Sequence, residues 1–518
     1  MSKTIVEDDE SIDLAWLIDN KKLKVTYRTI KWSAIQIALL YLMPWIGESY
    51  FGTSVVILIV LYTALYNAWI VYVRKSIRLK MIWLPYALYE LMALLFYIFS
   101  DNSSLRLYTL LPFFGFFVYL IIRITKRLSH KSMIRKMSLG VACIITLLVM
   151  INIGARWHSR NQGAIESEKY ELMQRRAFLI DKLLTTPQGV LNAMPSGIGE
   201  QFQGEYALYS CSMFQSALVN MSYAYPELRK ENIHLADSLI KIVLSSELRR
   251  YDRLRWDEDP LESLDGNKSH MSYISHLAWM ICGYKKIGGG DDYNELLDRL
   301  CATLARRMEN APALNLLTYP GESIYIPDML VAIVALKQYA DLNGGKYQDL
   351  VDKWLQHAST DWIDDDTGLL VSFLSNEGDQ HSDLPVKGSY SALNCYYLSI
   401  VDEKIARQQY ELLKKLFWKD GALDGLKEYY DRSCYLGIDI DAGPILMELS
   451  PSGTAFMVGC ATYFNDDDTR KKVLLTAEKV GWSVMWNGKR HYLLANFALV
   501  GESIMLAMRT HWTMLFQT

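Results

Sequence analysis

Two different patterns of apolar residues divide the chain. Between residues 33 and 155 the apolar residues arrive in five blocks, at about 33–50, 54–73, 81–99, 108–122 and 138–154. A helix needs roughly 17 to 25 apolar residues to cross the hydrocarbon core of a membrane. The pattern therefore predicts an N-terminal segment at 1–32 and a transmembrane region of about five helices at 33–155, which makes the lipid bilayer an expected partner.

Basic residues set the expected orientation of these helices. Lys and Arg gather in residues 1–32 and in the second and fourth connections, whereas the first and third connections hold only Arg106. Because cytoplasmic loops carry the excess of positive charge, we expect a cytoplasmic N-terminus and an extracytoplasmic region at 156–518. No cleavable signal peptide is expected, since about 30 mostly polar residues precede the first apolar block. The prediction is an integral protein of a bacterial inner membrane.

After residue 155 the apolar residues recur at the spacing of an amphipathic helix. The spacing predicts twelve helices, near 168–185, 205–223, 233–248, 269–285, 291–308, 328–342, 346–360, 389–402, 404–417, 443–464, 467–479 and 491–510. Short turns such as GGKY and FNDDDT alternate with longer loops, and short turns join antiparallel neighbours. The region is therefore expected to consist of six helical hairpins.

Six hairpins that close into a ring form an (α/α)6 toroid, in which the inner helices and long loops frame one axial cleft. An open right-handed solenoid is the alternative. The fold class that the sequence predicts is all-α: a five-helix transmembrane region followed by an (α/α)6 toroid at 156–518.

Charge and cysteine content narrow the possible functions. Residues 156–518 hold 48 acidic and 37 basic side chains, so this region is a poor candidate for binding nucleic acid. The seven cysteines show no CxxC or Cys/His spacing, which favours buried thiols over a metal or redox site. No metal and no cofactor is expected.

If the hairpins are phased in this way, the second helix of each pair begins at the cleft, where polar side chains face the axis. These starts, together with the loop aromatic residues nearby, supply the candidates Glu205, Tyr209, His270, Tyr273, Tyr319, Tyr325, Asp328, Tyr390, Asp439 and Asp441. Carboxylates, a histidine and tyrosines that recur at equivalent positions suit acid/base catalysis. We expect Asp328, Glu205 and His270 to be catalytic and the other residues to contact substrate.

Structural roles compete with this interpretation. Asp328 and Glu205 are residue types that accept backbone N–H groups or oppose the macrodipole at a helix N-terminus. His270 also suits a surface or hydrogen-bonding role. In the sequence DID, Asp439 and Asp441 fit cation or sugar-hydroxyl binding and simple loop structure equally well.

Four stretches resemble the linalool dehydratase-isomerase family, whose catalytic domain is an (α/α)6 barrel. They are YALYSCSMFQSALVNMSYAYPEL, GNKSHMSYISHLAWMICGYKKIGG, YIPDMLVAIVALKQYADLNGGKYQDLVDKWLQHASTDWIDDDTGLL and GIDIDAGPILMELSPSGTAFMVGCATYFND. The resemblance covers about 205–512 and none of the membrane region. It implies that His270 matches the family's active-site histidine and that Tyr209 lines the pocket. It also places Thr318 and Asp328 where the family has two proton-transferring cysteines, which implies altered chemistry on a more polar substrate.

Three functions follow as hypotheses. The first is a membrane-anchored lyase or isomerase that transfers protons through Asp328, Glu205 and His270 to and from a small molecule. The second is a glycan-processing hydrolase, lyase or epimerase at the cell envelope. The third is a non-catalytic membrane subunit, because Glu48 and Glu90 are acidic residues inside apolar blocks.

Overall fold

A computed structural model describes residues 165–512 except 196–198, 440 and 497. Contacts divide the chain into two units, and the larger unit comprises Ala155–Ser483 and Gly488–Thr518. The segment at 1–32, the five transmembrane helices and the membrane orientation that the sequence predicts lie outside the described residues. None of the helices within the described residues combines the length and the apolar character that a membrane crossing needs.

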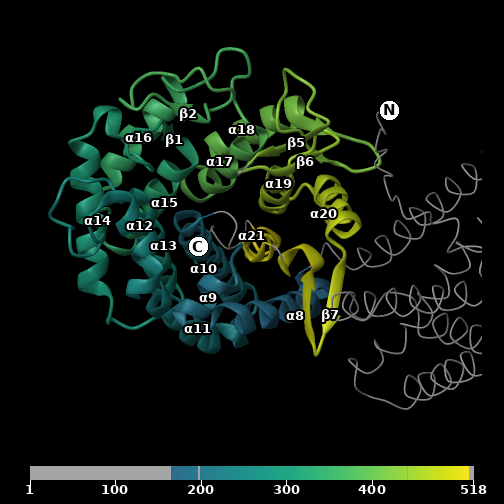
Figure 1. The fold of residues 1–518 in the computed structure, drawn as a ribbon, viewed down its shortest axis with the longest axis horizontal. Coiled ribbons are helices and arrows are strands. Elements are labelled where there is room, and N and C mark those ends of the chain that lie inside the picture. Colours follow the sequence, from purple (N-terminus) through teal and green to yellow (C-terminus); the bar gives the residue numbers. More distant parts are fainter. Residues whose placement is uncertain (1–164, 196–198, 440, 497, 513–518) are drawn as a thin grey trace, which may run out of the picture. The chain divides into compact units, whose positions relative to one another are not determined.

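Helices dominate the described residues, which confirms the all-α prediction there. Six helices form an inner layer: α10 (Glu200–Ala224), α13 (Met271–Lys286), α15 (Ile326–Leu342), α17 (Gly388–Val401), α19 (Pro451–Tyr463) and α21 (Leu499–Arg509). Each inner helix packs against the next, and α21 packs against α10, so the layer closes on itself around a common centre (Figure 1).

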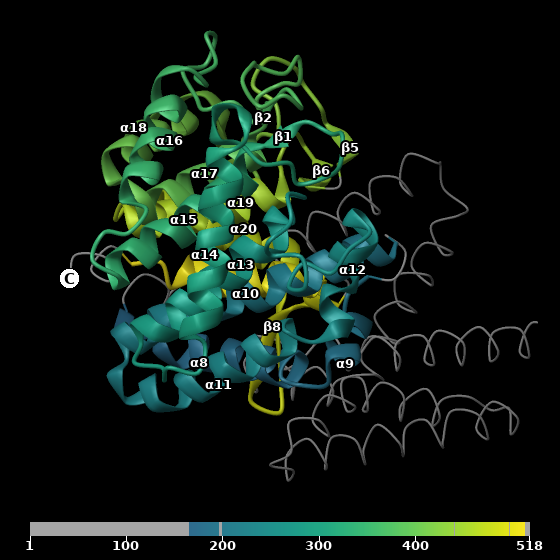
Figure 2. The same ribbon diagram turned by 90° about the vertical axis from the view of Figure 1, so that its left-hand side faces the viewer.

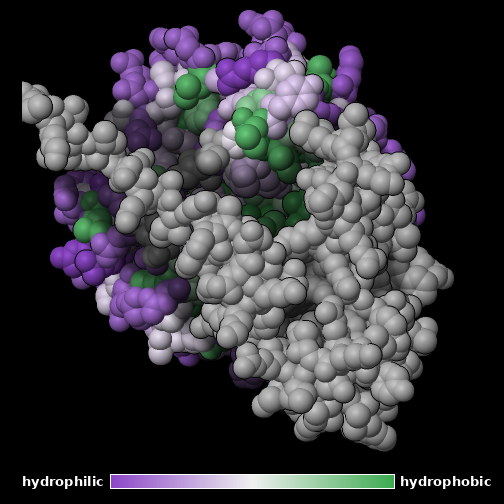
Figure 3. All heavy atoms as spheres, turned by 45° about the vertical axis from the view of Figure 1, so that its right-hand side comes forward, coloured by the Kyte–Doolittle hydropathy of each residue, from purple (hydrophilic) through white to green (hydrophobic). Residues whose placement is uncertain are grey.

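Six further helices pack on the outside of this layer: α8 (Ile165–Leu183), α11 (Arg229–Val243), α14 (Asn294–Glu309), α16 (Gln348–Thr360), α18 (Glu403–Phe417) and α20 (Asp467–Gly481). Nearly every residue of α13 and α17 is buried, as expected for helices with neighbours on all sides. The outer helices bury one face, and hydrophilic side chains cover most of the visible outer surface of the described residues (Figure 3).

Local sequence explains where several helices begin. Ser245 and Asp466 cap α12 (Ser246–Trp256) and α20 by accepting backbone N–H groups. Ser450 caps α19 in the same way, and Pro451 follows in its first turn, where the missing N–H costs nothing.

The remaining elements are short. They are α9 (Pro187–Asn192), the 3₁₀ helices at Pro226–Leu228, Pro312–Leu314 and Leu493–Asn496, and the strands β1 (Ile324–Tyr325), β2 (Phe373–Leu374), β3 (Trp418–Lys419), β4 (Gly425–Leu426), β5 (Leu436–Asp439), β6 (Gly443–Leu446), β7 (Ser483–Trp486) and β8 (Lys489–Tyr492). The strands pair as β1–β2, β3–β4, β5–β6 and β7–β8. Figure 2 shows the β5–β6 hairpin and α12 at the same end of the ring of helices.

Each of the twelve predicted helices has a counterpart, but several predicted boundaries are wrong. The helix predicted at 443–464 begins at Pro451, because 443–446 pair with β5 as strand β6. The helix predicted at 491–510 begins at Leu499, after β8 and a 3₁₀ turn. The structure also contains α12, which the sequence pattern did not predict. Its buried residues include Asp252 and Arg255, so its buried face is not a simple apolar stripe.

Candidate functional site

Asp328 lies in the first turn of α15, but it does not cap that helix. The N-cap position is Tyr325, and no side chain bonds the end of the helix there. Instead, the two carboxylate oxygens of Asp328 accept hydrogen bonds from the hydroxyls of Tyr209 on α10, at 2.9 Å, and of Thr318, at 2.8 Å. The carboxylate therefore accepts hydrogen bonds within a polar cluster between helices and does not cap the end of its own helix.

The surroundings of Asp328 make it hold a proton near neutral pH. Removal from water and, next, the negative charge of Glu205 raise its pKa from 3.8 to about 7, although the bonds from Thr318 and Tyr209 favour the charged form. A carboxyl group with a pKa near the ambient pH can both give and take a proton, as general acid/base catalysis requires.

Glu205 lies in the second turn of α10, which begins at Glu200 rather than at 205. Its oxygens accept two hydrogen bonds from the guanidinium of Arg255 on α12, at 3.2 and 3.0 Å, and the side chain of Arg255 is only 1% exposed. The hydroxyl of Tyr319 donates a third hydrogen bond at 2.9 Å. Both carboxylate oxygens of Glu205 are therefore engaged, and two of these hydrogen bonds come from a guanidinium group.

Tyr319 also completes a stack that fixes Arg255. The guanidinium carbon of Arg255 lies 4.1 Å from the centre of the Tyr319 ring, within the range of a cation–π contact. Burial and the charge of Glu205 raise the pKa of Tyr319 well above its usual range, so this residue stays a hydrogen-bond donor.

His270 belongs to a neighbouring network rather than to the Asp328 cluster. It occupies the N-cap position of α13 with a left-handed backbone (φ 46°), and its side chain is completely buried. Its Nδ1 lies 2.5 Å from Asp252 of α12, and its Nε2 lies 3.1 Å from Glu258. Both ring nitrogens are therefore engaged, and the link from His270 to Glu205 runs through α12, which carries both Asp252 and Arg255.

Four aromatic rings from loops and helix starts lie next to this cluster. The rings of Tyr319 and Tyr325 are 5.4 Å apart, and Phe373 lies 5.2 Å from Tyr325 and 5.1 Å from Tyr390. The β1–β2 pair holds Tyr325 opposite Phe373. Three of the predicted contact residues, Tyr319, Tyr325 and Tyr390, are thus brought together, and these four rings are called the aromatic wall below.

Other predicted site residues lie in structural positions. Tyr273 is fully buried, and its hydroxyl donates to the backbone oxygen of Val243 in α11 at 2.9 Å, so it faces an outer helix and not the axis. Tyr273 therefore does not take the axis-facing position that the phasing of the hairpins predicts. The reason is that its hydroxyl satisfies the last carbonyl of α11, one of the groups that a helix end leaves without an intrahelical partner.

Asp439 shapes the β5–β6 turn. It accepts the backbone N–H groups of Asp441 and Ala442 at 2.9 Å and pairs with Lys387 at 2.7 Å. Asp441 lies 3.6 Å from the same lysine and bonds Tyr390 of the aromatic wall. The contacts of Asp439 support the simple loop role that was one of its two alternatives. Asp441, in contrast, reaches the aromatic wall.

Arg255 and Glu428 were missed by sequence reasoning. Arg255 pairs with Glu205, and Glu428 is a fully buried carboxyl group whose pKa is raised by burial to about 7. Glu428 accepts hydrogen bonds from the backbone N–H and hydroxyl of Ser389 at the start of α17. Gly388 permits this approach, because a Cβ there would lie 2.0 Å from the Lys427 carbonyl oxygen.

His276 packs against Tyr209, and the centres of the two rings lie 4.4 Å apart. Burial lowers the pKa of His276 to about 3, so the imidazole is neutral at physiological pH. Its Nδ1 has no hydrogen-bond partner within the described residues, which leaves it available to a ligand or water beside Tyr209.

The described residues hold no group of three or more His, Cys, Asp or Glu side chains arranged for a metal ion. Five of the six cysteines there are buried, and Cys434 is half-buried. The chain matches no known protein-family model and no characterised protein at a significant level. The geometry of the Asp328 cluster is therefore the basis for any functional assignment.

Proposed function

We propose that the ring of six helix pairs is an (α/α)6 toroid and that the chain is a membrane-anchored enzyme of the lyase or isomerase type. In this proposal Asp328 exchanges a proton with a small, polar substrate. The observation that supports it best is the environment of Asp328, where two hydroxyl donors meet a carboxyl group whose pKa is raised to about 7. The resemblance of residues 205–512 to the linalool dehydratase-isomerase family suggests the same class of chemistry.

Asp328 and Glu205 have different roles in the proposed reaction. As an acid, Asp328 gives its proton to a leaving hydroxyl, so that the C–O bond breaks and water departs. As a base, it takes a proton from the adjacent carbon, and the electron pair of that C–H bond forms the new double bond. Glu205, which pairs with Arg255, places negative charge near Asp328 and so raises the pKa of Asp328.

Two further residues orient the reaction. Tyr209 donates to Asp328 and packs on His276, so it fixes the direction of the carboxyl group. His270 has both ring nitrogens bound to carboxylates, and we therefore assign it to positioning α12 and Arg255 rather than to proton transfer. This assignment replaces the catalytic role that the sequence suggested for His270.

The experiment that tests the function follows solvent protons. The full chain in detergent is incubated in D₂O with a panel of small allylic and tertiary alcohols and with uronate sugars, and deuterium incorporation and loss of water are read by mass spectrometry. Asp328→Asn should abolish both signals. Asp341→Asn is the matched control, because Asp341 lies in the last turn of the same helix and pairs with Lys337 on the surface. Full turnover in Asp328→Asn would overturn the proposal.

A glycan-processing enzyme is the second candidate, and the aromatic wall favours it. Aromatic rings beside carboxylates suit the stacking of sugar rings and oxocarbenium chemistry. In the same panel, turnover of the uronate sugars and of none of the alcohols would select this candidate. The third hypothesis, a non-catalytic membrane subunit, rests on Glu48 and Glu90, which lie outside the described residues.

The membrane placement is a separate part of the proposal, supported by the five apolar blocks and the distribution of Lys and Arg. Cys434 offers a probe, since it is the one cysteine in the described residues that is not fully buried. A membrane-impermeant maleimide should label Cys434 in intact spheroplasts, and Cys434→Ser should remove the label. Labelling only after lysis would place this region in the cytoplasm.

A further inference from the structure

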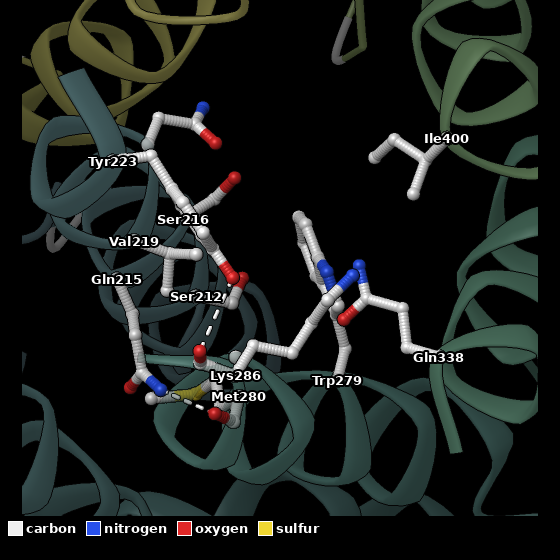
Figure 4. A pocket seen from close by; sticks show the side chains of 12 residues that line it. Ser212, Gln215, Ser216, Val219, Tyr223, Trp279, Met280, Lys286, Gln338 and Ile400 are labelled. Atoms are coloured by element: carbon white, nitrogen blue, oxygen red, sulfur yellow. Dashed lines mark hydrogen bonds between the residues drawn. The ribbon is translucent and has the colours of Figure 1, made fainter. Parts of the chain in front are cut away.

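A pocket lies at the opposite end of the inner helices from the Asp328 cluster. The cluster lies in the first three turns of α10 and the first turn of α15, whereas the pocket is lined by residues of later turns of α10, α13 and α15 and of the end of α17. The lining residues used below are Asn220 and, labelled in Figure 4, Gln215, Trp279, Lys286, Gln338 and Ile400. Its inner part leaves ≈ 30 Å³ for the centres of water-sized molecules, which is room for a ligand of a few heavy atoms.

Three buried amide side chains in this lining lack hydrogen-bond partners among the described residues. The atoms are Oε1 of Gln215, Nδ2 of Asn220 and Oε1 of Gln338, in side chains of residues that are 1%, 4% and 6% exposed. A buried polar atom without a partner is unfavourable, because it has given up its hydrogen bond to water. A polar ligand in this pocket would supply partners for the three atoms.

Lys286 brings a positive charge to the same pocket. No carboxylate in the described part of the chain lies within ion-pair distance of its ammonium group, whereas the neighbouring Lys285 pairs with Asp291 at 2.6 Å. Burial lowers the pKa of Lys286, and the charge of Asp341 opposes this only in part. An anion in the pocket would supply the missing counter-charge.

Apolar groups complete the lining. Trp279 and Ile400 face the space from α13 and α17, while the polar side chains reach it from α10, α13 and α15 (Figure 4). A ligand that fits this distribution has a charged end, a hydrogen-bonding group and a short carbon skeleton between them.

We propose that this pocket binds a small hydroxycarboxylate, with its carboxylate against Lys286 and Asn220 and its hydroxyl donating to the amide oxygen of Gln338 or Gln215. The ammonium group and the Asn220 amide are donors, as a carboxylate needs, and the two glutamine oxygens are acceptors, as a hydroxyl needs. The site is separate from the Asp328 cluster, so the proposal goes beyond the proposed function and does not depend on it.

Three probes of nearly equal size separate the parts of this proposal. Lactate has both the charge and the hydroxyl, propionate has the charge alone, and lactamide has the hydroxyl without the charge. Calorimetric titration of the full chain in detergent should give the order lactate, then propionate, then lactamide. Lys286→Met should weaken lactate binding roughly tenfold or more, to the level of lactamide, and Gln338→Leu should bring lactate to the level of propionate.

Two control variants show whether a change in lactate binding is specific to this pocket. Lys285→Met should leave binding unchanged, since Lys285 is the adjacent residue and points to Asp291. Asp328→Asn should also leave it unchanged, which separates this site from the proposed function. If Lys286→Met fails to fold, Lys286→Arg keeps the charge and should still bind lactate more tightly than lactamide. Equal binding of lactate and lactamide, absence of binding by the unaltered chain, or an equal loss in Lys285→Met would overturn the proposal.

Discussion

The hydroxyl of Tyr209 on α10 donates to Oδ1 of Asp328 on α15 at 2.9 Å, although 119 positions separate the two residues. Helix α13 packs between α10 and α15, so this bond joins two helices that are not consecutive neighbours in the ring. The bond favours the charged form of Asp328 and therefore opposes the rise in its pKa.

Tyr209→Phe should raise the pKa of Asp328 further above 7, by about one unit, because the charged carboxylate loses a donor. Carboxyl ¹³C chemical shifts followed across pH measure this directly. Tyr223→Phe is the matched control on the same helix, since the Tyr223 hydroxyl donates to the Lys286 carbonyl at the other end of α10. An unchanged pKa in Tyr209→Phe would show that this hydrogen bond does not control the proton on Asp328.

Asp328→Asn should stabilise the protein at alkaline pH. The pKa of Asp328 is about 7 in the folded protein against an ordinary value of 3.8, so the folded state binds the proton more tightly and loses stability as pH rises from about 4 to above 7. Removing the charge should raise the free energy of unfolding at pH 8 by an amount on the order of 1 to 3 kcal/mol. Melting temperatures at pH 8 and pH 4.5 check this, and the gain should vanish at the lower pH. A variant less stable than the natural chain at pH 8 contradicts the expectation.

Arg255→Met should be strongly destabilising, because it leaves Glu205 as a buried carboxylate without its counter-charge. Breaking a buried ion pair from one side costs about 3 to 5 kcal/mol, while replacing both partners with apolar residues recovers much of the loss. The double variant Arg255→Met with Glu205→Leu should therefore melt at a higher temperature than Arg255→Met alone. Arg250→Met is the control on the same helix, since Arg250 pairs with Glu200 on the surface and both side chains are more than half exposed.

His270→Asn should change the protonation of Asp328 as well as stability, if His270 positions α12. Loss of the contact with Asp252 loosens Arg255, Glu205 is then less neutralised, and the pKa of Asp328 rises. A fall in melting temperature with an unchanged pKa of Asp328 would instead give His270 a purely structural role.

Arg175→Met tests the contact that joins the first and last helices of the ring. The Arg175 guanidinium on α8 bonds Glu502 of α21 at 2.7 Å, and both side chains are fully buried. The loss should be about 3 to 5 kcal/mol, measured by chemical denaturation of the full chain. Lys241→Met, which breaks a pair between an exposed lysine and Asp237, should cost much less.

Sequence periodicity predicted the helices because their burial follows a 3.6-residue repeat, but it failed where charge is buried. Helix α12 carries Asp252 and Arg255 on its buried side, so the pattern there resembled a solvated segment. Because this helix was not predicted, the sequence did not indicate that Arg255 belongs to the site.

The position of Asp328 at a helix start could be predicted, but its partners could not. Short loops and hairpin phasing placed Glu205, Tyr209 and Asp328 near one end of the ring, and the structure brings them together. A carboxylate at this position can cap its own helix or accept hydrogen bonds from other elements. The outcome depends on the conformation of the preceding loop, which here places the Thr318 hydroxyl against Asp328. Tyr273 was expected to face the axis because it lies at a helix start. A residue there can also face the outer helices, and the Tyr273 hydroxyl does so by bonding Val243 of α11.

The ion pairs between α8 and α21 affect how the chain folds while it is being synthesised. Glu168 and Glu171 on α8 emerge from the ribosome more than 300 positions before their partner Arg509 on α21. Until Arg509 is made, Glu171 has its ion-pair partner Arg175 within α8, but the contacts of Glu168 and Glu171 with α21 cannot form. Ribosome-stalled chains that stop before residue 509 should therefore remain protease-sensitive along α8, and protection should begin only once the last inner helix is released.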